Sequence, residues 1–149
     1  VELILKICRL GKNINEKFAD TYYNEIGLGI DFTARDIQAQ CKKNGHPWEK
    51  AKAFDQSAVV SSLFIEKESL DLTKINFRLE KNNRVVQQGN SSDMLFNFNQ
   101  LISYVSKYMT LKIGDLIFTG TPAGVGKVEI GDELVGYLEN KKAFTTRIK

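Results

Sequence analysis

Hydrophobic and polar positions alternate at the beginning of the chain and again in its second half. Val1, Leu3, Leu5 and Ile7 follow a period of two, which is typical of a strand with one buried face. Similar patterns, separated by Gly, Asn and Asp residues, predict further strands over residues 25–32, 75–79, 84–88, 115–119, 133–137 and 143–148. Within this series, Asn82-Asn83 is a suitable tight turn between two strands.

Helical patterns are fewer and shorter. Residues 16–23 form one short candidate, and Thr33 is a suitable N-cap for a second helix over residues 34–44. Asn99 is a candidate cap for a third helix that continues to Tyr108 with its apolar residues on one side. Strands and helices do not alternate regularly, which disfavours doubly wound and barrel α/β architectures. The pattern predicts an α+β fold that is rich in strands.

Length and composition indicate one globular domain over residues 1–149. A chain of this size buries roughly 70% of its unfolded surface, and no linker, repeat or low-complexity tract divides the sequence. Hydrophobic residues make up 42% and charged residues 26%, and no run approaches the ~20 apolar residues that span a bilayer. The net charge is +3, with Lys and Arg scattered among acidic residues. We therefore expect neither a membrane nor a nucleic acid as a partner.

The two cysteines and the identity of the first residue affect what we expect about the location of the protein in the cell. Cys8 and Cys41 are the only cysteines, and neither belongs to a Cys/His cluster, so we expect free thiols and a cytoplasmic protein. Val1 lies inside a strand-like run and is not Met. We therefore expect the natural chain to begin further upstream, where any targeting signal would lie outside this sequence.

Polar side chains gather where the strand over residues 25–32 meets the following helix. Asp31 or Thr33 alone would be explained as a helix cap. That explanation does not cover Arg35, which the helical period places near Gln38 and one turn beyond Asp31. An acid, a guanidinium and an amide that converge there would suit a metal ion and an anionic substrate.

Two further charged residues interrupt apolar surroundings. Glu2 is expected on the face of its strand opposite Leu3 and Leu5. A solvent-facing side chain is the common explanation, but Mg2+ takes carboxylates that are brought together from separate elements. Lys52 lies between apolar neighbours. Most lysines are solvated, yet one beside a dicarbonyl substrate would stabilise enolate charge or bind a carboxylate.

The glycine-rich run over residues 119–127 does not match a phosphate-binding loop. A Walker loop has four residues between its first glycine and Gly-Lys, whereas five residues separate Gly120 from Gly126. The glycines would let the backbone pass close to a ligand, with Thr121 offering its hydroxyl and amide. A tight turn between two strands is the plain alternative. His46 is the only histidine, so a Ser–His–Asp triad is disfavoured and a surface loop position is expected.

Four segments together resemble the fumarylacetoacetate hydrolase family, and most closely its acylpyruvase and oxaloacetate decarboxylase branch. In chain order they are GIDFTARDIQ, PWEKAKAFDQSAVVS, NSSDMLFNFNQLISYVSKYMTLKIGDLIFTGTPAGVG and GDEL. The resemblance extends over essentially the whole chain. It implies a catalytic domain over residues 1–149 with the family's mixed β-roll and short helices, usually as a homodimer.

The resemblance also implies a set of site residues. Glu2 matches the second glutamate of the family's Glu-x-Glu metal pair, Asp31 matches its aspartate, and the first glutamate would fall immediately before Val1. Lys52 matches a substrate-facing position and is the expected catalytic residue. The family's water-activating His and Glu lie on an N-terminal lid segment that this sequence does not contain. The remaining substrate-facing positions correspond to Arg35, Gln38, Gly120 and Thr121.

The chemistry that the resemblance implies is Mg2+-dependent, with Mn2+ or Ca2+ as substitute ions. The expected reaction is cleavage of a C–C bond in acylpyruvates, or decarboxylation of oxaloacetate, with pyruvate as the product. The partner would be a small 2-oxo acid. Three alternatives stay open: an isomerase, decarboxylase or hydratase of aromatic meta-cleavage diacids, an oxaloacetate tautomerase, or a non-catalytic ligand-binding remnant.

Overall fold

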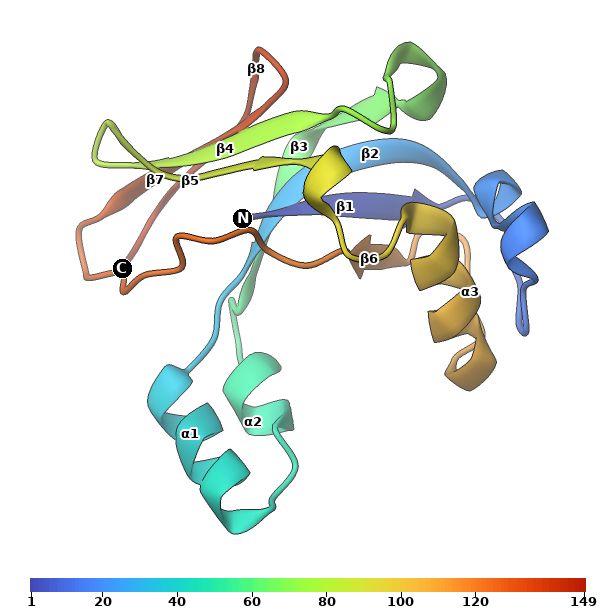
Figure 1. Cartoon of the computed structure of the whole chain (residues 1–149). Helices are drawn as coiled ribbons and strands as arrows, with labels where there is room; N and C mark the ends of the chain where they lie inside the picture. Colours follow the sequence, from blue (N-terminus) through green and yellow to red (C-terminus); the bar gives the residue numbers. More distant parts are fainter.

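Two four-stranded antiparallel sheets face one another in the computed structural model, which describes residues 1–149 (Figure 1). The first sheet has the strand order β3-β2-β1-β6, and the second has the order β5-β4-β7-β8. The predicted strand-rich α+β fold is confirmed. In chain order the strands are β1 Glu2–Ile7, β2 Tyr23–Asp31, β3 Ala58–Glu66, β4 Asn76–Lys81, β5 Arg84–Asn90, β6 Leu116–Phe118, β7 Glu133–Leu138 and β8 Lys141–Arg147.

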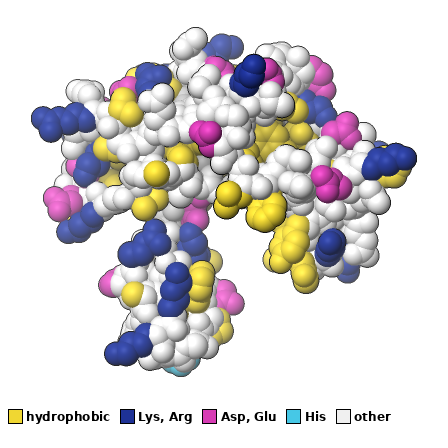
Figure 2. All heavy atoms as spheres, in the orientation of Figure 1, with side chains coloured by type: hydrophobic (Ala, Val, Ile, Leu, Met, Phe, Trp, Pro, Cys, Tyr) yellow, Lys and Arg dark blue, Asp and Glu magenta, His cyan; other side chains and the backbone are white.

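The helices lie at the two ends of the first sheet. The helices α1 (Arg35–Asn44) and α2 (Glu49–Lys52) form an arm that projects from the ends of β2 and β3 (Figure 1). At the other end, α3 (Phe98–Tyr108) packs beside the 3-10 helix η1 (Glu16–Tyr22). The space-filling view shows the arm as a separate lobe with Lys and Arg side chains on its visible surface (Figure 2). Two further 3-10 turns are η2 Lys67–Ser69 and η3 Ser91–Asp93.

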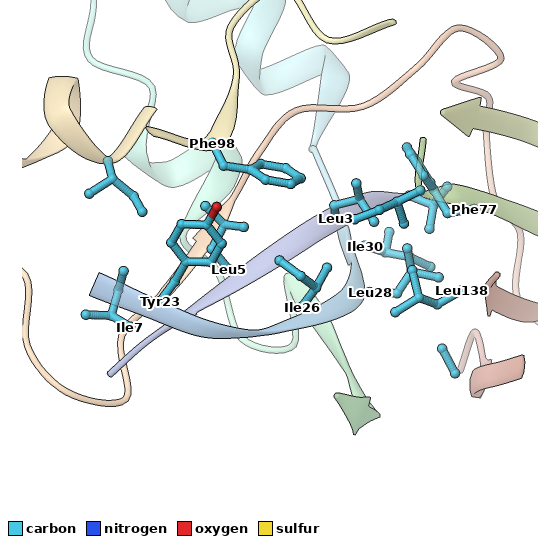
Figure 3. Packing of buried hydrophobic residues seen from close by; sticks show 14 of the residues in the cluster. Leu3, Leu5, Ile7, Tyr23, Ile26, Leu28, Ile30, Phe77, Phe98 and Leu138 are labelled. Atoms are coloured by element: carbon cyan, nitrogen blue, oxygen red, sulfur yellow. The ribbon is translucent and has the colours of Figure 1, made fainter. Parts of the chain in front are cut away.

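One hydrophobic core lies between the sheets. Leu3 and Leu5 of β1, with Ile26 and Leu28 of β2, are each at most 1% exposed. Because side chains alternate along a strand, these residues share the inner face of the first sheet. The alternate residues of β1 and β2 therefore point to the outer face of the first sheet. On the inner side the buried residues meet residues of the second sheet and of α3, among them Phe77, Leu138 and Phe98 (Figure 3).

A complete capping box begins α3. The Asn97 side chain accepts a hydrogen bond from the Gln100 N–H, and the Gln100 side chain accepts one from the Asn97 N–H, both at 2.9 Å. The prediction of Asn99 as the cap is therefore wrong, because Asn99 lies inside the helix. Ser106 of α3 is fully buried, and its hydroxyl accepts from the Ile14 N–H at 2.9 Å. This bond ties α3 to the segment before η1.

Backbone hydrogen bonds join the two chain segments at the base of the arm. The Phe32 N–H donates to the Ser57 carbonyl at 2.8 Å, and the Ala34 N–H donates to the Ala51 carbonyl at 3.0 Å. Ala34 is the residue that precedes α1, and the helix has no side-chain cap. The predicted N-cap role of Thr33 is therefore wrong, because its hydroxyl is engaged elsewhere.

The predicted strands are confirmed to within two residues at each end. Asn82 and Asn83 form the turn between β4 and β5 with φ angles of +51° and +63°, as a type I′ hairpin requires. The candidate helix over residues 16–23 is a 3-10 helix. One α-helix and one strand were not predicted, nor were the 3-10 turns η2 and η3. The single turn α2 is too short to show a helical period, and β3 is an edge strand with a bulge in its pairing to β2.

The register between β1 and β2 depends on a glycine. Gly29 stands opposite Glu2. A β-carbon at Gly29 would lie 2.4 Å from the Val59 carbonyl oxygen and 2.5 Å from Ile4 Cδ1. The first of these contacts is with backbone, so rotation of a side chain cannot relieve it.

Gly29→Ala should therefore lower the free energy of unfolding by about 1–3 kcal/mol through overpacking. Chemical denaturation measures this change. Gly126→Ala is the matched control, because a β-carbon there meets nothing within 4 Å, and it should change the free energy by less than ~0.5 kcal/mol. A Gly29→Ala protein as stable as the native one would contradict the close approach of β3 to Gly29.

Candidate active site

Glu2 is a buried carboxylate on the outer face of β1. It points away from Leu3 and Leu5, and the residue is only 7% exposed. Its Oε2 accepts a hydrogen bond from the Gly120 N–H at 2.7 Å. The common explanation, a solvent-facing side chain, is therefore wrong. Burial raises the pKa of Glu2, and the negative charge of Asp31 adds to the shift, while the Gly120 N–H opposes it.

Asp31 and Lys52 form an ion pair where the first sheet meets the arm. Asp31 is the last residue of β2, and Lys52 is the last residue of α2. The Lys52 Nζ also donates a hydrogen bond to the Thr33 hydroxyl at 2.9 Å. The ammonium is thus held by two oxygen-bearing side chains, which explains why Thr33 does not cap α1.

Glu2 and Asp31 lie on the same face of adjacent strands. Glu2 pairs with Gly29, and Asp31 is two residues further along β2, so both side chains leave the same side of the sheet. Residues related in this way are diagonal neighbours, about 7–8 Å apart, and their carboxylates can converge on one ion. In the same register, a residue immediately before Val1 would stand opposite Asp31, where the family resemblance places the first glutamate.

The loop after β6 is held by hydrogen bonds. The Thr121 hydroxyl donates to the Val1 carbonyl and accepts from Gln87 Nε2, both at 2.9 Å. Gln87 is only 5% exposed. The Thr121 hydroxyl, which was expected to face the substrate, is therefore engaged within the protein. The Thr121 backbone N–H makes no hydrogen bond within the chain. Sequence reasoning missed Gln87, because this residue belongs to no recognisable motif. Only the register of its strand indicates that its side chain is buried.

Arg35 and Gln38 meet in the first turn of α1, as the helical period predicts. Arg35 Nη1 donates to Gln38 Oε1 at 2.9 Å. Gln38 is buried at 6% exposure, whereas Arg35 is exposed. They make no hydrogen bond or ion pair with the carboxylates or with Lys52. The structure therefore gathers the carboxylates, Lys52 and the Gly120 amide, and it holds Arg35 and Gln38 as a separate pair at the start of the arm.

The donor set suits a hard divalent cation. No group of three or more His, Cys, Asp or Glu side chains is placed to hold a metal ion, so the chain offers the two carboxylates of Glu2 and Asp31. Mg2+ is usually bound by one or two carboxylates, with water and substrate oxygens in the other positions. A cation beside Glu2 would also offset the repulsion between the two carboxylates. The residues present therefore fit the ion that the family resemblance implies.

A cavity of about 250 Å³ adjoins the loop after β6. Gly120 and Thr121 line it together with residues that include Phe77 and Leu101. Neither carboxylate nor Lys52 contributes to its wall, and Phe77 belongs to the hydrophobic core. We place the candidate site at the carboxylates, because opposite charges and hydrogen-bond donors converge there.

The remaining chemically distinctive side chains lie outside this site. His46 is exposed in the loop between α1 and α2, as predicted. Cys8 and Cys41 are free, and Cys41 is buried. Among the helices, none has both the length and the apolar character needed to cross a membrane.

Comparison with known proteins gives four informative matches. The family model described as fumarylacetoacetate (FAA) hydrolase C-terminal matches residues 1–149. An uncharacterised Pyrococcus abyssi protein is 39% identical over 93% of this chain and 62% of its own length. The mitochondrial oxaloacetate tautomerase FAHD1 of Mus musculus is 40% identical over 100% of this chain and 67% of its own length. The crystal structure of fumarylpyruvate hydrolase from Pseudomonas aeruginosa, in complex with Mn2+ and pyruvate, superposes with a TM-score of 0.91 at 30% identity, covering 99% of this chain and 63% of that one.

The chain therefore belongs to the fumarylacetoacetate hydrolase family, as its motifs indicated. It spans about three fifths to two thirds of the length of these relatives. The Mn2+ ion in the P. aeruginosa structure is consistent with divalent-cation binding in this family.

Asp31→Asn should weaken divalent-cation binding by roughly tenfold or more while the fold is retained, because an amide is a neutral and weaker ligand. Isothermal titration of the complete gene product with Mn2+ measures the affinity, and circular dichroism reports the fold. Asp36→Asn changes an exposed acid in the first turn of α1, and as the matched control it should leave the affinity unchanged. Equal Mn2+ affinities for the native and Asp31→Asn proteins would place the ion elsewhere.

Proposed function

We propose that this protein is an enzyme that binds a small 2-oxo acid beside Glu2, Asp31 and Lys52 and stabilises the enolate of that acid. One observation carries the proposal. Two carboxylates on one face of adjacent strands lie beside an ammonium group that is itself held by Asp31 and Thr33. Membership of the fumarylacetoacetate hydrolase family supports it.

Glu2 and Asp31 would hold a divalent cation, for which we propose Mg2+. When bound, such an ion would act as a Lewis acid toward the 2-oxo and carboxylate oxygens of the substrate. The Gly120 N–H keeps the Glu2 carboxylate oriented toward this face of the sheet. The chain thus presents its two acidic ligands before a substrate arrives.

Lys52 would hold the negative charge that develops on the enolate oxygen. Its hydrogen bonds to Asp31 and Thr33 direct the ammonium toward the same region as the carboxylates. A preorganised donor aimed at a developing charge typically contributes about 3–4 kcal/mol to the transition state. The carboxylate groups of the substrate would be positioned by Arg35, by Gln38 and by the backbone N–H of Thr121, which makes no hydrogen bond within the chain.

The fate of the enolate decides the overall reaction. Loss of CO2 from oxaloacetate leaves the enolate of pyruvate. Attack of water on the second carbonyl of an acylpyruvate, followed by cleavage of the C–C bond, releases the acyl group as a carboxylic acid and leaves the same enolate. Protonation at carbon then gives pyruvate in both cases. We propose pyruvate release as the activity, because the motifs most closely resemble the acylpyruvase and oxaloacetate decarboxylase branch.

Oxaloacetate tautomerisation is the second candidate function. It needs only the transfer of a proton between the 2-oxo oxygen and the carbon beside it, through the same kind of enolate. The mouse relative that matches the full length of this chain at 40% identity is named for this activity.

With Mg2+, the complete gene product should release pyruvate from oxaloacetate and from acetylpyruvate. Oxalate should inhibit, because it resembles the planar pyruvate enolate and binds as a transition-state analogue does. Lys52→Ala should lower kcat/KM by roughly 10²–10³ and should weaken oxalate inhibition. Lys50→Ala, at an exposed lysine of the same helix, is the matched control and should leave both unchanged. A coupled pyruvate assay with and without chelator measures these effects.

The substrate panel also separates the alternatives. Loss of the oxaloacetate enol signal without pyruvate release would favour the tautomerase. Conversion of a meta-cleavage diacid alone would favour the isomerase. Oxalate binding without metal-dependent turnover of any substrate would contradict an enzymatic role and favour the ligand-binding remnant.

A further inference from the structure

Gln87 is a buried polar side chain that reaches from the second sheet to the candidate site. It lies on β5, an edge strand, and is 5% exposed, whereas its neighbour Gln88 is exposed. Oε1 accepts a hydrogen bond from the Val1 nitrogen at 2.7 Å. Nε2 donates to the Thr121 hydroxyl at 2.9 Å and to the Pro122 carbonyl at 3.1 Å. Both hydrogens of the amide are therefore used, together with its oxygen.

The partners of Gln87 flank the hydrogen bond between Glu2 and Gly120. Val1 immediately precedes Glu2, and Thr121 immediately follows Gly120. Because Gln87 donates to the Thr121 hydroxyl, the hydroxyl proton is free to point at the Val1 carbonyl, 2.9 Å away. One side chain thus clamps the two backbone segments that carry the buried carboxylate and its N–H donor.

The next part of the loop, at Gly124, also lies close to β5. Gly124 has a φ of +97°, and a β-carbon there would lie 2.4 Å from the Val86 carbonyl oxygen. The backbone of the loop therefore passes directly beside the strand that carries Gln87. Glycine at position 124 permits this close approach, and the Gln87 side chain spans the same gap nearer to the site.

We propose that Gln87 is a positioning residue that keeps the Gly120 N–H on the Glu2 carboxylate. It makes no hydrogen bond with Glu2 and acts through Val1 and Thr121. Without it, the buried carboxylate would lose its one hydrogen-bond donor, and leaving a buried charged acceptor unsatisfied is costly. The consequence for cation binding rests on the proposed function, whereas the effect on the Glu2–Gly120 hydrogen bond does not.

Gln87→Met tests the proposal, because it keeps the length of the side chain and removes its hydrogen bonds. Amide hydrogen exchange, followed by NMR without metal or substrate, reports the Glu2–Gly120 bond directly. The Gly120 N–H should exchange about tenfold faster, as expected for the loss of one buried hydrogen bond. The core Leu28 N–H, which is bonded to the Ser61 hydroxyl, should keep its rate. Gln88→Ala is the matched control and should change neither rate.

Unchanged Gly120 exchange in Gln87→Met would overturn the proposal. Equal acceleration at Leu28 would overturn it too, because that result describes a general loss of stability. Should Gln87→Met fail to fold, Gln87→Asn gives the same comparison with an amide that is one methylene shorter. Titration with Mn2+ distinguishes the positioning role of Gln87 from the proposed metal site. Faster Gly120 exchange together with an Mn2+ affinity about tenfold weaker supports both proposals. Faster exchange with unchanged affinity supports the positioning role and counts against the metal site.

Discussion

A carboxylate is costly to bury unless hydrogen-bond donors or cations replace the water that it loses. Glu2 lies on a central strand of the first sheet, and it meets this constraint through the Gly120 N–H. The neighbouring chain is arranged around that bond. Strand β6 pairs with β1, so the loop that follows it arrives beside Glu2. Gly29 leaves room on β2, and the Lys52 ammonium offsets part of the negative charge that Asp31 adds.

Most elements of the fold could be predicted because their signals are local. Period-two alternation defines β1 and the strands of the second sheet, and Asn82-Asn83 specifies its turn type. The caps were harder, since several polar residues near a helix end satisfy the same rule. Asn97 caps α3 in place of Asn99 because the Gln100 side chain accepts a hydrogen bond from the Asn97 N–H and so completes the capping box. The Thr33 hydroxyl accepts a hydrogen bond from Lys52 and does not cap α1.

The candidate site was only partly predictable from the residues, because burial is a property of remote neighbours. Alternation places Glu2 on the outer face of β1, but the groups that cover this face come from residues around Gly120 and from the arm. The family motifs supplied those partners, which spacing alone could not. Gln87 and Gln88 are identical in type and adjacent in the sequence. Only the register of β5 decides that the first is enclosed and the second is exposed.

The pairing of β1 with strands at both of its edges has a consequence for the order of folding. Its partner β2 follows soon after it in the chain, whereas Leu5 pairs with Ile117 on the other edge. Contacts between distant parts of a chain form slowly, so the edge of β1 that β6 will occupy stays unpaired for a time after the β1–β2 hairpin has formed. Unpaired strand edges recruit other chains. The nascent protein is therefore most prone to misassociation during synthesis of the segment that ends with β6.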